Sequence, residues 1–107
     1  MPTQYRRRYE LLLPTNFNDG SPIPRKLMGQ TLREIRKRFG TISVETQRIE
    51  GQWEHHGKVY LDLNARVFVD VTDTPENRQF FVDFKERLKE RFQQIDIWMT
   101  TYLVEVI

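Results

Sequence analysis

The 107-residue sequence contains no cysteine, which excludes disulfide bonds and thiolate-bound metals. It also contains no apolar run near the roughly 18 residues that a membrane-spanning helix requires. The first residues are basic, but they lack the apolar core and the small-residue cleavage site of a signal peptide. Glycine-rich phosphate loops and the GxSxG and HExxH motifs are absent too. We therefore expect a cytoplasmic protein without a membrane anchor.

The overall amino-acid composition favours one folded domain over residues 1–107. Apolar residues make up 38% of the chain and charged residues 30%, a balance typical of a polar surface around a core rather than of disorder. A domain of this length buries roughly two-thirds of the surface that its unfolded chain exposes. One hydrophobic core can therefore hold the chain together without disulfides or metals.

Positive charge is concentrated at the start of the chain. Residues 1–40 carry nine Lys and Arg against three Asp and Glu, whereas residues 41–107 carry eight against twelve. Such an imbalance indicates an anionic partner, charge complementarity between copies of the chain, or simply a solvated surface. The residues that we expect to contact an anionic partner are Arg6, Arg7, Arg8, Arg36, Lys37 and Arg38.

Hydrophobic periodicity and turn residues divide the chain into six elements. The pattern predicts a strand over 5–14, a helix over 24–40, a long β-hairpin over 41–71, a helix over 73–94 and a strand over 96–107. The order is β-α-β-β-α-β, in which two right-handed crossovers merge into one sheet. We therefore predict a ferredoxin-like α+β sandwich, an antiparallel sheet with two helices on one face.

Each predicted helix carries an apolar stripe. The stripe residues are Met28, Leu32, Ile35 and Phe39 in the first helix, and Phe81, Phe84, Leu88 and Phe92 in the second. Gly29 interrupts the first pattern at a cost of up to about 1 kcal/mol relative to Ala, and close packing of the helix on the sheet is one possible reason. In the hairpin, a change of apolar phase near 47–50 indicates a bulge.

The stretch 59–71 alternates strictly between two faces. Its odd positions are all apolar, from Val59 to Val71, and we expect this row to lie under the helices. The even positions then face away from the helices, together with alternate residues of the last strand. The residues that we expect to form a ligand site or an interface on this open face are Tyr60, Asp62, Arg66, Phe68, Trp98 and Tyr102. So many aromatic side chains indicate a covered surface, and a second copy in a homodimer is the simplest cover.

No catalytic residue, metal site or cofactor is predicted. His55 and His56 are adjacent, so on a strand they point to opposite faces and cannot easily bind one metal. In a turn they could share one, but a carboxylate would have to complete the site, and we expect two exposed turn residues. Asp62, Asp70 and Asp96 could pair as acid and base or bind a cation, but their spacing matches no known signature.

Three functions stay open, and a non-catalytic binding or assembly module is our first expectation. The second is a small enzyme or ligand-binding protein of the dimeric α/β-barrel type, with a cavity between sheet and helices lined by Trp98, Tyr102, Tyr60 and Arg66. The third is an RNA-binding domain, because RNA-recognition modules share this topology. The corresponding strand here lacks their glycine and paired aromatics, and its acids would repel phosphate.

The stretches FGTISVETQRIEGQWEHHGKVYLDLNARVFV and DTPENRQFFVDFKERLKERFQQIDIWM resemble an uncharacterised family of small bacterial ferredoxin-like proteins. The likeness covers about residues 5–107 and is carried most by Gly51, Gln52 and Trp53. It implies the same fold and no known chemistry. In structural terms, Gly51 would allow a bend and Trp53 would cover the edge of the core.

Overall fold

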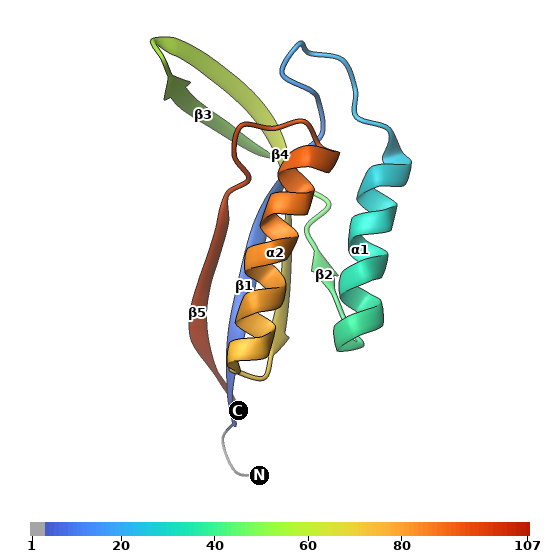
Figure 1. Ribbon diagram of the computed structural model, residues 1–107, viewed down its shortest axis with the longest axis vertical. Coiled ribbons are helices and arrows are strands. Elements are labelled where there is room, and N and C mark those ends of the chain that lie inside the picture. Colours follow the sequence, from blue (N-terminus) through green and yellow to red (C-terminus); the bar gives the residue numbers. More distant parts are fainter. Residues whose placement is uncertain (1–3) are drawn as a thin grey trace.

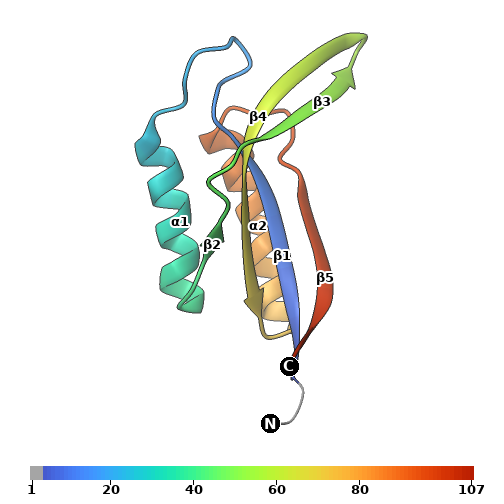
Figure 2. The ribbon, with the colours of Figure 1, turned by 180° about the vertical axis from the view of Figure 1, so that it is seen from behind.

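The computed structural model describes residues 4–107 and contains two helices packed on one antiparallel sheet (Figure 1). The elements are β1 (Gln4–Pro14), α1 (Arg25–Phe39), β2 (Ser43–Val44), β3 (Ile49–His55), β4 (Lys58–Val71), α2 (Pro75–Arg91) and β5 (Met99–Val106). The strand order is β2-β4-β1-β5, with β3 also paired to β4. This is the predicted ferredoxin-like α+β fold, which is confirmed. Seen from behind, the second face of the sheet carries no helix formed by residues 4–107 (Figure 2).

The two central strands form the floor of the core. β1 pairs with β4 from Arg7↔Val71 to Pro14↔Asn64, and its other edge pairs with β5 as far as Leu11↔Met99. Leu11 and Leu13 are fully buried on the helix side. Because side chains alternate along a strand, the even-numbered residues of β1 face the open side of the sheet, which we call the outer face.

Both apolar helix stripes pack against this floor, as the periodicity predicted. Ile35, Phe84, Leu88 and Phe92 are fully buried, and Phe81 is 1% exposed. The remaining stripe residues are partly buried against the same core: Met28, Leu32 and Phe39.

Local sequence signals determine where the helices begin and end. The Thr74 hydroxyl accepts a hydrogen bond from the backbone N–H of Asn77 at 3.1 Å, and Pro75 takes the first helical position of α2. Gly40 ends α1 in the left-handed conformation, with φ of 82°. The Arg91 guanidinium then joins the two helices, since it donates to Glu34 and to the buried Thr31 hydroxyl, each at 2.9 Å.

The apolar row of β4 lies under the helices only in its second half. Ala65, Val67, Val69 and Val71 are buried as expected. The prediction is wrong for Val59, Leu61 and Leu63, which are 56%, 67% and 49% exposed. The physical reason is the length of the β3–β4 hairpin, which extends beyond the ends of both helices (Figure 1). Alternation assigns a face, but it does not tell how far the helix layer reaches.

The hairpin turns where the sequence predicted, at His56 and Gly57, which have φ of 49° and 75°. The expected bulge is a longer interruption than predicted. Val44 pairs with Val67 and Ile49 pairs with Asn64, so four residues, 45–48, lie opposite only two residues of β4. This interruption separates β2 from β3. Within the range 4–107, no helix has the length and apolar content needed to cross a membrane.

Candidate ligand-binding site

The middle of the outer face is occupied by a network of paired charges. The Phe68 ring lies between two guanidiniums, Arg8 at 4.7 Å and Arg66 at 4.5 Å from its centroid. Arg8 donates two hydrogen bonds to the Asp70 carboxylate, at 2.7 and 2.9 Å. Arg66 donates to Glu45 at 2.6 Å and also to a further carboxylate, that of Glu10.

Glu10 links this network to β5, since its carboxylate accepts from Arg66 and from the Tyr102 hydroxyl. Burial alone would raise the pKa of Glu10, but these hydrogen bonds outweigh it and hold the pKa below its ordinary value. The hydrogen bond to Asp70 raises the pKa of Arg8, and the hydrogen bond to Glu10 raises the pKa of Arg66. Both guanidiniums are therefore paired with carboxylates, and three carboxylates face only two guanidiniums. The network is better suited to holding strands together than to binding an anion.

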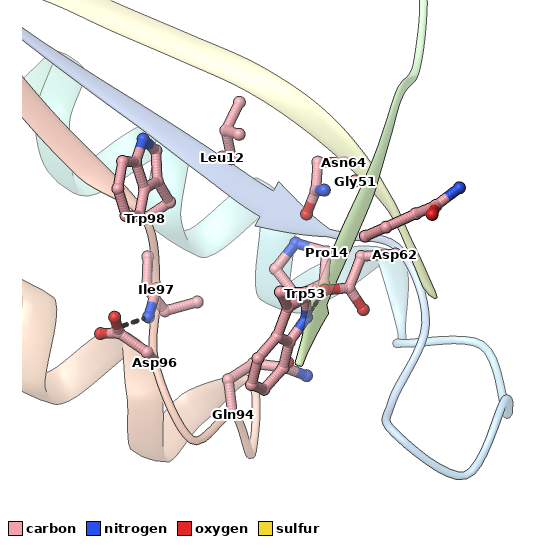
Figure 3. Close-up of a pocket in the computed structure, with 11 residues that line it drawn as sticks. Leu12, Pro14, Gly51, Trp53, Asp62, Asn64, Gln94, Asp96, Ile97 and Trp98 are labelled. Atoms are coloured by element: carbon pink, nitrogen blue, oxygen red, sulfur yellow. Dashed lines mark hydrogen bonds between the residues drawn. The ribbon is translucent and has the colours of Figure 1, made fainter. Parts of the chain in front are cut away.

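Beyond the end of β1, the sheet has a gap that forms a pocket of about 390 Å³. It lies between the β3–β4 hairpin and the segment that joins α2 to β5 (Figure 3). The pocket opens where β1 ends at Pro14 while β4 continues to Lys58. Eleven described residues line it: Leu12, Pro14, Gly51, Gln52, Trp53, Asp62, Asn64, Gln94, Asp96, Ile97 and Trp98.

The Asn64 amide is the most unusual polar group in the pocket. Asn64 is only 7% exposed, and no group of residues 4–107 is hydrogen-bonded to its side chain. The amide is nevertheless open to the pocket, because among the described residues only the Thr101 hydroxyl oxygen is fully buried without a hydrogen-bond partner. A ligand in the pocket can therefore reach both the donor and the acceptor of the Asn64 amide. A Cβ at Gly51 would lie 3.3 Å from the Asn64 amide nitrogen, so Gly51 leaves room for this amide. Gly51 thus permits close approach of the Asn64 amide.

Two indole rings line the pocket. Trp53 stacks on Tyr60 with ring centroids 4.4 Å apart, and its Nε1–H donates to the Asp62 carboxylate at 2.6 Å. These contacts fix the orientation of the Trp53 ring. Trp98 is 65% exposed, and in Figure 3 its ring lies well apart from that of Trp53. The Trp98 ring therefore offers an apolar face on which a ligand or partner could pack.

The charge in the pocket is negative. Asp96 forms an ion pair with Lys85 at 3.1 Å, so this carboxylate is largely balanced. Asp62 has no ion-pair partner among residues 4–107, and its hydrogen bond comes from the neutral Trp53 indole. None of the eleven described lining residues is basic. The pocket therefore favours a neutral or cationic ligand over a phosphate.

The predicted open-face residues are divided between two places. Asp62 and Trp98 line the pocket, whereas Arg66, Phe68 and Tyr102 belong to the charge network. The Tyr60 ring stacks on the Trp53 ring. The expected cavity between sheet and helices lined by Trp98, Tyr102, Tyr60 and Arg66 is therefore wrong in its position, because helix side chains fill that space and the pocket lies on the outer face.

Sequence reasoning did not single out several residues that line the pocket, namely Leu12, Pro14, Asn64, Gln94 and Ile97. Asn64 did carry a signal, since it is the one amide in the even row of β4, but its burial depends on where β1 ends. At the tip of the hairpin, the rings of His55 and His56 touch each other with centroids 4.1 Å apart. Within residues 4–107, no cluster of three or more metal-ligating side chains is present.

The fold and the pocket together describe a ferredoxin-like domain with a ligand-sized cavity on its open sheet face. A phage SAM lyase in complex with S-methyl-5'-thioadenosine has a similar structure, with a TM-score of 0.68 and 14% sequence identity over 94% of this chain and 88% of that one. A phage SAM lyase in its apo state gives a TM-score of 0.58 and 15% identity, over 97% and 89%. At these identities the likeness shows a shared fold.

No protein-family model matches the sequence, and no curated protein matches it either. The resemblance to an uncharacterised bacterial family therefore stays a prediction, while the fold that it implied is confirmed.

Proposed function

We propose that this protein is a binding module for an adenosyl thioether or adenosyl sulfonium, held in the pocket at the end of β1. The single observation that carries the proposal is the Asn64 amide, which belongs to a residue only 7% exposed, lines the pocket and has no hydrogen-bond partner in residues 4–107. Its donor and acceptor would both be satisfied by a ligand that offers the complementary pair.

Adenine offers that pair. Its N7 accepts and its N6 amino group donates along one edge, and an Asn amide matches this edge with two hydrogen bonds. Adenine also has a flat apolar face, and stacking of a base on an aromatic side chain is worth about 1–3 kcal/mol. The indoles of Trp53 and Trp98 line the same pocket as Asn64. The combination of amide and indoles therefore supports an adenine ring over an aliphatic ligand.

The negative charge selects among adenine compounds. Asp62 has no cationic partner among the described residues, and no basic side chain lines the pocket. A nucleoside triphosphate would bring several negative charges next to this carboxylate. A sulfonium brings a positive charge, which both the carboxylate and the indole faces attract. We therefore expect adenosyl sulfoniums and neutral adenosyl thioethers to bind and adenine nucleotides to be rejected.

The similar fold of a phage SAM lyase supports the same ligand class, because that enzyme forms a complex with S-methyl-5'-thioadenosine. A pocket of about 390 Å³ also falls in the range of roughly 300–1,000 Å³ that small-molecule sites occupy. Our proposal concerns binding. Turnover of S-adenosylmethionine would add an activity to this same site.

Calorimetric titration with S-adenosylmethionine, S-methyl-5'-thioadenosine and ATP tests the proposal. We expect the first two compounds to bind and ATP to give no heat. Asn64→Leu should weaken both by about 5- to 150-fold, since the lost pair is worth about 1–3 kcal/mol. Asp62→Asn should weaken the sulfonium more than the thioether. Chromatography of the same mixtures measures any release of S-methyl-5'-thioadenosine.

Asn18→Leu is the matched control, because Asn18 is an exposed residue outside this pocket. Thermal unfolding of each variant separates loss of binding from loss of fold. Binding of ATP as tight as that of the sulfonium, or full affinity in Asn64→Leu, would refute the proposed function.

A second candidate function is self-association through the outer face, as a homodimer. It is favoured by the exposure of Trp98 and Tyr102, which are 65% and 42% exposed. We expect the mass measured by sedimentation equilibrium to rise with concentration, and Trp98→Ala to reduce it. A monomer at high micromolar concentration would exclude this candidate while leaving the pocket proposal intact.

A further inference from the structure

The outer side of α1 is a continuous basic surface. With about 100° per residue in an α-helix, positions 25, 26, 33, 36 and 37 fall within an arc of about 120°, centred roughly opposite the buried residues Thr31 and Ile35. All five positions carry Arg or Lys, and all five are exposed. We call them the α1 basic face: Arg25, Lys26, Arg33, Arg36 and Lys37.

This face differs from the other basic residues in its lack of partners. None of its five side chains forms an ion pair or a hydrogen bond with residues 4–107. By contrast, Arg7 pairs with Asp73 and Arg8 pairs with Asp70. The only acidic residue of α1, Glu34, forms an ion pair with Arg91 of α2. The basic residues that the sequence grouped as one contact surface are therefore divided. Arg8 lies on the outer face of the sheet, whereas α1 covers the opposite face of the sheet.

Gly29 lies within the same arc, between the basic side chains. A Cβ added at Gly29 would meet nothing within 4 Å, so close packing on the sheet, which we expected, is not the reason for this glycine. A mid-helix glycine costs about 1 kcal/mol relative to Ala. Its effect is to leave helix backbone uncovered in the middle of the basic face, where an anion can approach closely.

We propose that the α1 basic face binds the phosphate backbone of a nucleic acid, independently of base sequence. From Arg25 to Lys37 the helix rises by about 18 Å, a length over which one strand of a duplex carries about five phosphates. The exposed side chains of the face include no aromatic residue that could stack on a base. Backbone binding is thus the mode that these residues can support.

Charge and composition distinguish this partner from a membrane. Helices that bind membrane surfaces place apolar side chains beside their cations so that they can enter the acyl region. Every exposed residue on α1 is basic or is Gln30, so nothing on this face can enter a bilayer. The sheet is a poor alternative for nucleic acid, because Glu10, Glu45 and Asp70 surround Phe68.

Fluorescence anisotropy with a labelled 20-base-pair DNA duplex and a single-stranded RNA of the same length tests the proposal. We expect binding in low salt. The logarithm of the association constant should fall linearly with the logarithm of the salt concentration. Replacing Arg33 and Arg36 by Gln should weaken binding and reduce the salt slope by about 2, because each arginine neutralises one phosphate. The two probes distinguish DNA from RNA as the better source of phosphates.

The matched control replaces Arg48 and Arg78 by Gln, which changes the net charge equally. Both residues are exposed, lie outside α1 and form no ion pair with residues 4–107. We expect this control to keep the salt slope. Equal weakening in the control would overturn the proposal, since net charge alone would then explain binding. Absence of binding at 50 mM salt, or tighter retention on phosphatidylserine vesicles than on either nucleic acid, would overturn it as well.

Gly29→Gln provides a test that leaves the charge unchanged. Gln is a good helix former, so the variant should be at least as stable as the parent. Its side chain would cover the exposed backbone and hold phosphates away, and we expect the affinity for both probes to fall several-fold. Unchanged affinity would show that phosphates do not approach the helix backbone at Gly29. None of these residues lines the pocket, so ligand binding there should be unaffected.

Discussion

Gly29→Ala should stabilise this protein, although glycine-to-alanine changes often destabilise. Gly29 lies inside α1, its φ is not in the left-handed region, and an added Cβ would meet nothing within 4 Å. The substitution therefore creates no clash and no backbone strain. It removes the helix penalty of glycine, about 0.8–1.0 kcal/mol. With urea slopes of about 1–3 kcal/mol/M, the unfolding midpoint should rise by about 0.3–1 M.

Urea denaturation followed by circular dichroism at 222 nm measures this shift. Gly40→Ala is the matched control, since the same methyl group is added to the glycine that ends α1. Its φ of 82° is unfavourable for a residue with a Cβ, at a cost of roughly 1–2 kcal/mol. We therefore expect midpoints to move in opposite directions. A lower midpoint for Gly29→Ala would contradict the open space that surrounds this position in the structure.

Three further substitutions test the core, a buried hydroxyl and the charge network. Phe84→Ala should lower the free energy of unfolding by roughly 3–5 kcal/mol, because a fully buried ring leaves a cavity; a loss below about 1 kcal/mol would contradict its burial. Thr101→Val should raise that free energy by about 1 kcal/mol, because the Thr101 hydroxyl is buried without a hydrogen-bond partner in residues 4–107; destabilisation would show that the hydroxyl has one. Glu10→Gln concerns pH: the pKa of Glu10 is lowered in the fold, so its contribution is present at neutral pH and is lost as pH falls through that lowered pKa. Glu10→Gln should thus be less stable than the parent at neutral pH, and the difference should vanish in acid; a difference that persists in acid would refute this assignment.

The sequence determined the elements of the fold because their signals are local. The stripe through Phe81 and Phe84 repeats at helical spacing, Thr74 and Pro75 start α2, and Gly40 ends α1. Each of these depends on residues within a few positions of one another. The order of elements then left one simple arrangement, since crossovers between parallel strands are right-handed.

The sequence also separated the two faces of β4, but only the tertiary structure decided what each face meets. Val67 and Leu61 belong to the same apolar row, yet one is fully buried and the other is 67% exposed. The difference arises from where the helices stop, and that depends on contacts between distant segments. In the same way, the sequence allowed Arg66 to be a ligand-binding cation, whereas in the fold Glu10 and Glu45 neutralise it.

The pocket itself could not be deduced from the sequence. It exists because β1 ends at Pro14 while β4 continues, so a gap opens next to Asn64. The residues around that gap come from β1, the hairpin and the segment after α2, which are far apart in the chain. Local patterns indicate which side of a strand a residue faces. Whether a neighbouring strand extends far enough to pair beside that residue depends on the packed molecule alone.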